Sequence, residues 1–203
     1  MTSTDDTASS DLALIARARV GDARAFRVLV ERYEPVVASV VIGMMGSGDD
    51  ADDVGQETFI RFHAALSQFR GDSTVSTYLR KIAMNLSLNA LKRRTRDQSR
   101  LVRRDLAITP LHELSVAAID MEQQERRDAV RRAVAQLGEK QRSVVVLRLL
   151  EGLSTNETAD ALQLPPGTVM SRLSRGMREL AQRLAPFATT PDTDVSAGAS
   201  HAS

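Results

Sequence analysis

Residues 152–176 have the sequence GLSTNETADALQLPPGTVMSRLSRG, which predicts two short helices that meet at a tight turn. Gly152 is expected just after the preceding helix, where a left-handed backbone is common. Ser154 and Glu157 have the spacing of a capping box, so the next helix is expected to begin there. The two prolines that follow cannot donate backbone hydrogen bonds, and they end this helix. A second helix is expected to begin near Thr168.

The second helix of this stretch has one apolar and one polar face. The apolar positions recur every three or four residues and are expected to pack: Val169, Leu173, Met177 and Leu180. The polar face offers hydroxyl and guanidinium groups from Thr168, Ser171, Arg172 and Arg175. A helix of this kind, held by a partner helix across a turn, fits the major groove of DNA. The alternative is an ordinary helical hairpin with a solvated basic face.

Composition limits the classes of protein to consider. At 203 residues, of which 42% are apolar, the chain can form one domain or two small ones. The sequence has no cysteine, which excludes disulfides and thiolate zinc sites within it. It has neither a long apolar run nor a signal-like start, so we expect a cytoplasmic protein without membrane insertion.

Charge is distributed unevenly along the chain. Through Ile60 there are 11 acidic and 5 basic residues, a net charge of −6, and the remaining 15 acidic and 22 basic residues give +7. This polarity suggests one partner for the acidic part and a polyanion for the basic part. The most basic segment, residues 80–105, holds nine basic and two acidic residues. On its own, such a run is more often a solvated surface.

The N-terminal part predicts helices. Residues 1–10 lack periodicity and are expected to be a disordered tail, whereas 11–20 predict a short amphipathic helix. Residues 23–45 predict a longer helix with a kink or a break at Pro35. A strand over 36–42 is the alternative, because that stretch is rich in β-branched residues.

The segment 51–66 predicts a helix with two distinct faces. Aspartates at its start interact favourably with the helix dipole. They do not form an EF-hand loop from Asp50, because positions five and twelve would be Val54 and Arg61. The inward positions are Thr58, Phe59, Phe62 and Leu66. The other face carries Asp53, Gln56, Glu57 and Ile60, a pattern that is also typical of plain solvated surface.

The middle of the chain predicts a loop, a long helix and a linker. Residues 69–74 are expected to be a loop with Gly71 as the turn residue. A long helix follows from Val75, and its far end carries Lys92, Arg93, Arg94 and Arg96. Residues 97–122 lack a clear period and predict an interdomain linker. Beyond it we expect helices over 122–137 and 139–150, and a disordered tail over 187–203.

Three stretches resemble motifs of the sigma-70 family of RNA polymerase subunits. LQLPPGTVMSRLSR, residues 162–175, resembles the promoter-reading helix-turn-helix. DDADDVGQETFIRF, residues 49–62, resembles the region-2 helix that docks on core polymerase. FRGDS at 69–73 and TYLRKIAMN at 77–85 resemble the segment that opens and reads the −10 element. Their order and spacing resemble the two-domain, extracytoplasmic-function (ECF) branch, from about residue 11 to residue 184.

The resemblance implies an all-α fold of two small helical domains joined by a flexible linker. The first, 11–96, would bind core polymerase and the −10 element, and the second, 123–186, would bind the −35 element with its helix-turn-helix. Core-polymerase contact is implied for Asp53, Gln56, Glu57 and Ile60. Contact with −10 DNA is implied for Phe69, Ser73, Tyr78, Arg80, Lys81, Asn85, Lys92, Arg93 and Arg94. Contact with −35 DNA is implied for Thr168, Met170, Ser171, Arg172, Ser174 and Arg175.

Two departures from the family pattern suggest altered promoter use. Tyr78 stands where family members usually have tryptophan, so weak melting power is expected. Met170 stands where lysine or arginine is usual, so the −35 sequence is expected to differ. The partners implied are core RNA polymerase, promoter DNA and an anti-sigma factor, and neither a metal nor another cofactor is expected.

Two other classes of protein remain as alternatives. A helix-turn-helix repressor or activator would bind DNA without core polymerase, at half-sites one helical turn apart if dimeric. An enzyme is not expected, because His63, His112 and His201 have no nucleophile motif, phosphate loop or metal spacing around them.

Overall fold

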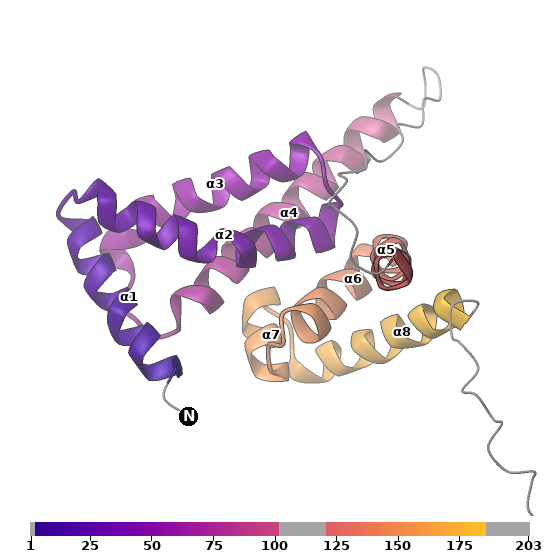
Figure 1. The fold of residues 1–203 in the computed structure, drawn as a ribbon. Helices are drawn as coiled ribbons and strands as arrows, with labels where there is room; N and C mark the ends of the chain where they lie inside the picture. The colour runs from indigo at the N-terminus through magenta and orange to yellow at the C-terminus, as the bar shows by residue number, and fades with distance from the viewer. Residues whose placement is uncertain (1–2, 102–120, 186–203) are drawn as a thin grey trace, which may run out of the picture.

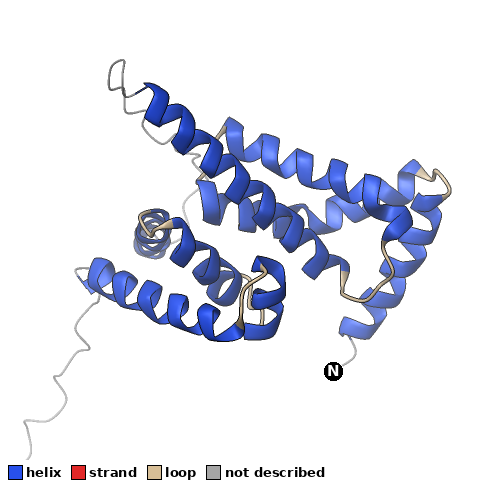
Figure 2. Ribbon diagram, turned by 180° about the vertical axis from the view of Figure 1, so that it is seen from behind, coloured by secondary structure: helices blue, strands red, loops and turns tan. Residues whose placement is uncertain are grey.

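The structure is a computed structural model that describes residues 3–101 and 121–185. Within these ranges it is helical and contains no strand, as expected for an all-α protein (Figures 1 and 2). The first group of helices is α1 (Ser3–Arg19), α2 (Ala23–Met45), α3 (Asp49–Ala65) and α4 (Val75–Leu101), with a short 3-10 turn at Leu66–Gln68. The second is α5 (Met121–Ala135), α6 (Glu139–Val145), α7 (Thr155–Leu162) and α8 (Pro166–Leu184), with a π-turn at Val146–Leu150.

Helices α2, α3 and α4 pack against one another, and α1 crosses α2. Asp22 begins α2 by accepting hydrogen bonds from the backbone N–H groups of Arg24 (2.9 Å) and Ala25 (3.1 Å). These backbone hydrogen bonds and the Arg17 side chain lower the pKa of the Asp22 carboxyl. The core of this domain is formed by apolar side chains with little or no exposure, including Leu29, Val37, Phe62, Leu79 and Met84.

Several boundaries differ from the sequence-based expectations. Helix α1 begins at Ser3, so the prediction of a disordered tail is wrong for residues 3–10. Helix α2 runs through Pro35 without a break, and residues 36–42 are helical rather than a strand. The buried side chains of Tyr33 and Val37 lie on either side of the proline, and their packing offsets the one hydrogen bond that it removes.

The second group forms a helix-turn-helix braced by α5 and α6. Helix α6 crosses α8 closely, because a Cβ placed on Gly176 would lie only 2.8 Å from Val145 Cγ2. Arg142 holds the C-terminal end of α5 by donating hydrogen bonds to the carbonyls of Ala135 and Leu137. Burial lowers the pKa of its guanidinium, yet these carbonyls and the negative C-terminal end of α5 favour a cation there.

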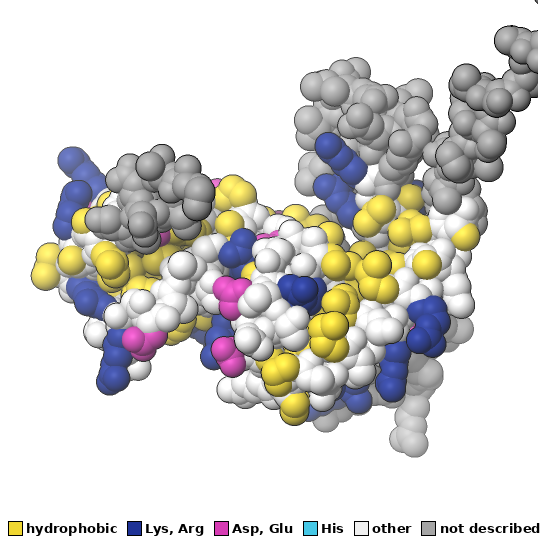
Figure 3. All heavy atoms as spheres, turned by 90° about the horizontal axis from the view of Figure 1, so that it is seen from below, with side chains coloured by type: hydrophobic (Ala, Val, Ile, Leu, Met, Phe, Trp, Pro, Cys, Tyr) yellow, Lys and Arg dark blue, Asp and Glu magenta, His cyan; other side chains and the backbone are white. Residues whose placement is uncertain are grey.

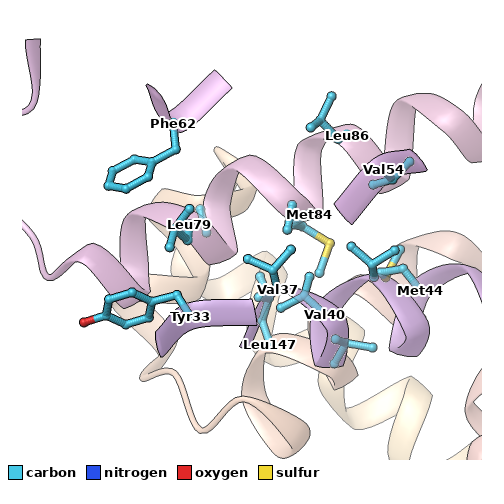
Figure 4. Packing of buried hydrophobic residues seen from close by; sticks show 14 of the residues in the cluster. Tyr33, Val37, Val40, Met44, Val54, Phe62, Leu79, Met84, Leu86 and Leu147 are labelled. Carbon is cyan, nitrogen blue, oxygen red and sulfur yellow. The ribbon is translucent and has the colours of Figure 1, made fainter. Parts of the chain in front are cut away.

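The two groups of helices share one apolar core. Val37, Val40 and Met44 of α2 belong to the same buried cluster as Val146 and Leu147 (Figure 4). Helix α4 also contacts α7, and α2 contacts α5 and α6. The second domain therefore packs directly on the first, an arrangement that the sequence did not predict.

The predicted linker, 97–122, is shorter than expected, because α4 continues through Leu101 and α5 begins at Met121. Residues 102–120 and the predicted tail from 187 lie outside the described residues. None of the helices described is long and apolar enough to cross a membrane. No cluster of metal-ligating side chains occurs within 3–101 and 121–185.

Candidate polymerase and nucleic-acid interfaces

The first candidate surface is the outer face of α3. Asp53, Gln56 and Ile60 are exposed, and Ile60 is 63% exposed despite its apolar side chain. Glu57 is half-buried and pairs with Arg61 at 2.8 Å, one helical turn away. The structure thus brings all four predicted polymerase-contact residues together along one groove beside α4. An exposed aliphatic side chain among carboxylates is suited to docking a partner that carries apolar and basic groups.

The second candidate surface starts at the loop between Gln68 and Val75. Phe69 is only 6% exposed and packs edge-on against Phe62, at 6.3 Å between ring centres, and against Tyr78, at 5.3 Å. Arg19 donates to the Phe69 carbonyl, which fixes the start of the loop. The Thr74 hydroxyl accepts from the Thr77 N–H at 3.1 Å and caps α4. The loop is therefore anchored at both ends, with Phe69 as an internal support.

Of the other predicted −10 residues, Ser73 lies in the loop and the rest lie along α4. Ser73 and Asn85 are exposed, whereas Tyr78 and Lys81 are half-buried. Lys92, Arg93 and Arg94 are exposed at the far end of the helix and can reach phosphates. Arg80 differs from them, because its Nε donates to Glu151 Oε2 at 2.8 Å and it also hydrogen-bonds to Ser76.

The third candidate surface is the helix-turn-helix of α7 and α8. Ser154 Oγ accepts from the Glu157 N–H at 3.2 Å, and Glu157 Oε2 accepts from the Ser154 N–H at 2.8 Å, which confirms the capping box. Hydrogen bonds with Ser154 lower the pKa of the Glu157 carboxyl. Gln163 ends α7 with left-handed backbone angles, φ 53° and ψ 50°, and α8 begins at Pro166 rather than near Thr168. The backbone therefore turns sharply between the two helices.

The outer face of α8 carries the predicted −35 residues. Met170, Ser171, Ser174 and Arg175 are exposed, and Thr168 and Arg172 are half-buried. The Ser171 hydroxyl donates to the Thr168 carbonyl at 3.0 Å. This face can present hydroxyls and a guanidinium to base edges, with Arg172 set further back.

One expectation on α8 is wrong. Met177 was expected to be buried, but it is 45% exposed, and Gly176 lies in the core instead. At 3.6 residues per turn, positions eight apart differ by about 80° in direction and positions seven apart by about 20°. Gly176 therefore follows Val169 on the inner face, whereas Met177 points outward.

Sequence reasoning missed Glu151, whose side chain is 4% exposed and pairs with Arg80 across the two domains. No local pattern could have found it, because its partner lies 71 residues away. The face seen in Figure 3 mixes basic, acidic and apolar side chains rather than presenting one continuous basic surface.

Comparison with known proteins agrees with this geometry. The family model described as Sigma-70 region 2 matches residues 29–97, and the model described as Sigma-70, region 4 matches residues 127–180. The chain belongs to the sigma-70 family. This sigma factor is 35% identical over 190 residues to RNA polymerase sigma-H factor of Pseudomonas aeruginosa, covering 89% of this chain and 97% of the relative. It is 37% identical over 184 residues to ECF RNA polymerase sigma-E factor of Salmonella typhimurium, covering 88% and 96%.

Solved structures have the same fold. CnrH in complex with the cytosolic domain of CnrY matches with a TM-score of 0.61 and 26% identity, over 87% of this sigma factor and 98% of that chain. The sigma factor RpoE of Bartonella quintana, in complex with the anti-sigma factor NepR, matches with a TM-score of 0.65 over 80% and 98%. At 21% identity, the second match supports the fold alone. The 37% identical relative, an ECF sigma-E factor, places the chain in the ECF branch.

Proposed function

We propose that this sigma factor binds core RNA polymerase and directs promoter-specific initiation by reading the −35 and −10 elements. The observation that carries the proposal is the outer face of α8, where Ser171, Ser174 and Arg175 are exposed on the second helix of a helix-turn-helix. Such a helix enters the major groove, where hydroxyl and guanidinium groups distinguish base pairs. Polar contacts of this kind provide the −35 specificity.

The α3 face is proposed to hold core polymerase. Ile60 would insert into an apolar site on the polymerase, and Asp53 and Gln56 would pair with polar and basic groups around it. A central apolar contact with a polar rim is the usual arrangement of a specific interface.

The α4 surface is proposed to bind the −10 element as a single strand. Ser73 and Asn85 would hydrogen-bond to an unstacked base, and the basic end of the helix would hold phosphates. Phe69 would support Tyr78 from within the core, because it is too buried to stack on a base itself.

Further partners follow from the family. The solved relatives include sigma factors in complex with CnrY and with the anti-sigma factor NepR. An anti-sigma factor is therefore a proposed partner of this chain. We propose that the protein acts in the cytoplasm and regulates transcription without catalysing a reaction.

The decisive experiment is multi-round transcription with cognate core polymerase on pooled genomic promoter DNA, with and without this protein. Discrete new transcripts are expected, and alignment of their start sites would give both promoter elements. Ile60→Asp should abolish these transcripts, whereas Val20→Asp, a change of the same kind at an 85% exposed position in the turn between α1 and α2, should preserve them. Clean DNA binding by the protein alone, without new transcripts, would instead support the repressor or activator reading.

A further inference from the structure

The second turn of α8 carries an exposed methionine on the face that would enter the major groove. Met170 is 52% exposed, and it lies beside Ser171 and one helical turn before Ser174, which are exposed as well. Its thioether is uncharged and is at most a weak hydrogen-bond acceptor, so it can neither hold a phosphate nor donate to a base edge. The ligand of Met170 therefore differs in kind from the ligands of the polar side chains around it.

A threonine of α7 holds this methionine in place. Helix α7 packs beside the start of α8 (Figure 1), and the Thr155 hydroxyl donates to the Met170 sulfur, with 3.6 Å between Oγ1 and Sδ. Methionine has three rotatable side-chain bonds, and this contact constrains the two that place the sulfur. Because a flexible side chain loses rotamer freedom when it binds, ordering it beforehand reduces the cost of binding. The thioether is thus held ready at an exposed position, where it contributes little to the core.

The major groove offers one group that suits an apolar side chain. Guanine, adenine and cytosine present hydrogen-bond donors and acceptors there, whereas thymine also presents its C5-methyl group. A polar base edge that faced the thioether would give up water without gaining a good hydrogen bond in return. The thymine methyl has no hydrogen bond to lose, and its removal from water is favourable. Contact with Met170 therefore favours thymine over the other three bases.

We propose that Met170 reads a thymine of the −35 element through its C5-methyl group, and that Thr155 is a positioning residue that holds the thioether for this contact. The inference rests on the proposed function, because it places α8 in the major groove of the −35 element. Ser171, Ser174 and Arg175 then read polar edges of neighbouring bases. One base pair of the element is selected by apolar contact, and promoters with another base at that position are used less.

Deoxyuridine tests the contact directly, because it pairs with adenine as thymidine does but lacks the C5-methyl group. A promoter found by the transcription experiment is prepared with deoxyuridine in place of one −35 thymidine at a time, on either strand. With the wild type and core polymerase, at least one replacement should lower transcription at limiting holoenzyme by about fourfold, the effect of one methyl group lost from an apolar contact. With Met170→Ala, the same replacement should have no effect.

Met177→Ala is the matched control, because Met177 is a second methionine of α8, 45% exposed and about two turns further along the helix. This variant should keep the full sensitivity to deoxyuridine. The proposal is overturned if no replacement affects the wild type, or if Met170→Ala loses as much transcription as the wild type does. If the wild type gives no transcripts, the proposed function fails instead. The same comparison on fluorescent duplexes that the protein alone selects from a random pool then decides whether Met170 contacts thymine.

Thr155→Val tests the positioning residue, because valine keeps the shape of threonine but cannot donate to the sulfur. It should reduce the fourfold deoxyuridine effect to about twofold, since the thioether is then no longer ordered before binding. Thr155→Ser, which keeps the hydroxyl, should restore the full effect. A purely structural role of Thr155 would lower transcription equally on the thymidine and deoxyuridine templates, and that result would overturn the role assigned to it.

Discussion

Asp11 is a carboxylate that the N-terminal fold has buried. It is 4% exposed, accepts a hydrogen bond from the Tyr33 hydroxyl, and pairs with Arg32 at 2.5 Å. Burial raises the pKa of Tyr33, and the hydrogen bond to Asp11 raises it further. The tyrosine therefore remains a donor at any physiological pH, and α1 is fixed to α2 by this contact.

Tyr33→Phe should lower the free energy of unfolding by about 1.5–3 kcal/mol, because the substitution removes a hydrogen bond to a buried charge. Urea denaturation followed by circular dichroism measures the change. Tyr78→Phe, at a half-buried tyrosine in the aromatic cluster, serves as the control. Equal stability of Tyr33→Phe and the wild type would mean that Arg32 alone satisfies Asp11.

Glu157 gives the helix-turn-helix a pH dependence. Its folded-state pKa is lowered from the usual 4.5, so its stabilising effect is present above that pH and is lost as pH falls through the lower folded value. Wild type should exceed Glu157→Gln in stability by about 0.3 kcal/mol at neutral pH, a small value because the side chain is exposed. Thermal unfolding of both proteins, from neutral pH down to a pH below the folded-state pKa of Glu157, should show that the difference in stability vanishes in acid. A difference independent of pH would argue against an ionised cap.

At the scale of elements, two glycines in helices have opposite surroundings. A Cβ on Gly176 would lie 2.8 Å from Val145 Cγ2, whereas one on Gly55 would meet nothing within 4 Å. Gly176→Ala should therefore destabilise the protein by about 1–3 kcal/mol through overpacking. Gly55→Ala should stabilise it by about 0.4–1 kcal/mol, because alanine restricts the unfolded chain. Chemical denaturation of the two variants checks both signs, and a stabilising Gly176→Ala would contradict the close crossing of α6 and α8.

The basic end of α4 should act through phosphates. Replacing Lys92, Arg93 and Arg94 by glutamine should reduce the slope of log affinity against log salt by about two on single-stranded DNA, at about 0.7 per contact. Fluorescence anisotropy of the wild type and the triple-glutamine variant over a salt series measures the slope. Arg24→Gln with Arg27→Gln, at exposed positions of α2, is the control. Identical slopes for the two sets would remove these residues from the DNA surface.

Features that depend on neighbouring residues were predictable from the sequence. The capping box, the end of α7 before the prolines and the inward positions of α3 each rest on spacings of four residues or fewer, and all were found. The burial of Gly176 instead of Met177 was missed, because a spacing of four residues drifts from the helical period over two turns. The Arg80–Glu151 pair was missed because contacts between distant segments have no local pattern.

At the scale of the whole molecule, the shared core joins the stability of the two domains. Val146 and Leu147 are buried against α2, so unfolding of either domain exposes apolar surface on the other. The wild type should therefore unfold in one calorimetric transition. A Cβ on Gly43 of α2 would lie 3.2 Å from both Cγ atoms of Val146. Gly43→Leu should therefore push α2 away from the second domain and give two transitions, the lower one shifted by several degrees. A single unshifted transition would show that α2 tolerates the added side chain without separation.

The π-turn at Val146–Leu150 has a consequence for how such a chain can evolve. A π-turn is an α-helix with one extra residue, and here the Glu151 N–H bonds to the Val146 carbonyl five residues back. Deleting one residue from this turn would restore a regular helix and rotate everything after it by about 100°. Glu151 would then point away from Arg80, and α7 and α8 would be turned out of their packing against α6. The extra residue therefore sets two contacts at once, the interdomain ion pair and the seat of the helix-turn-helix on α6, and a lineage that lost the residue would have to rebuild both.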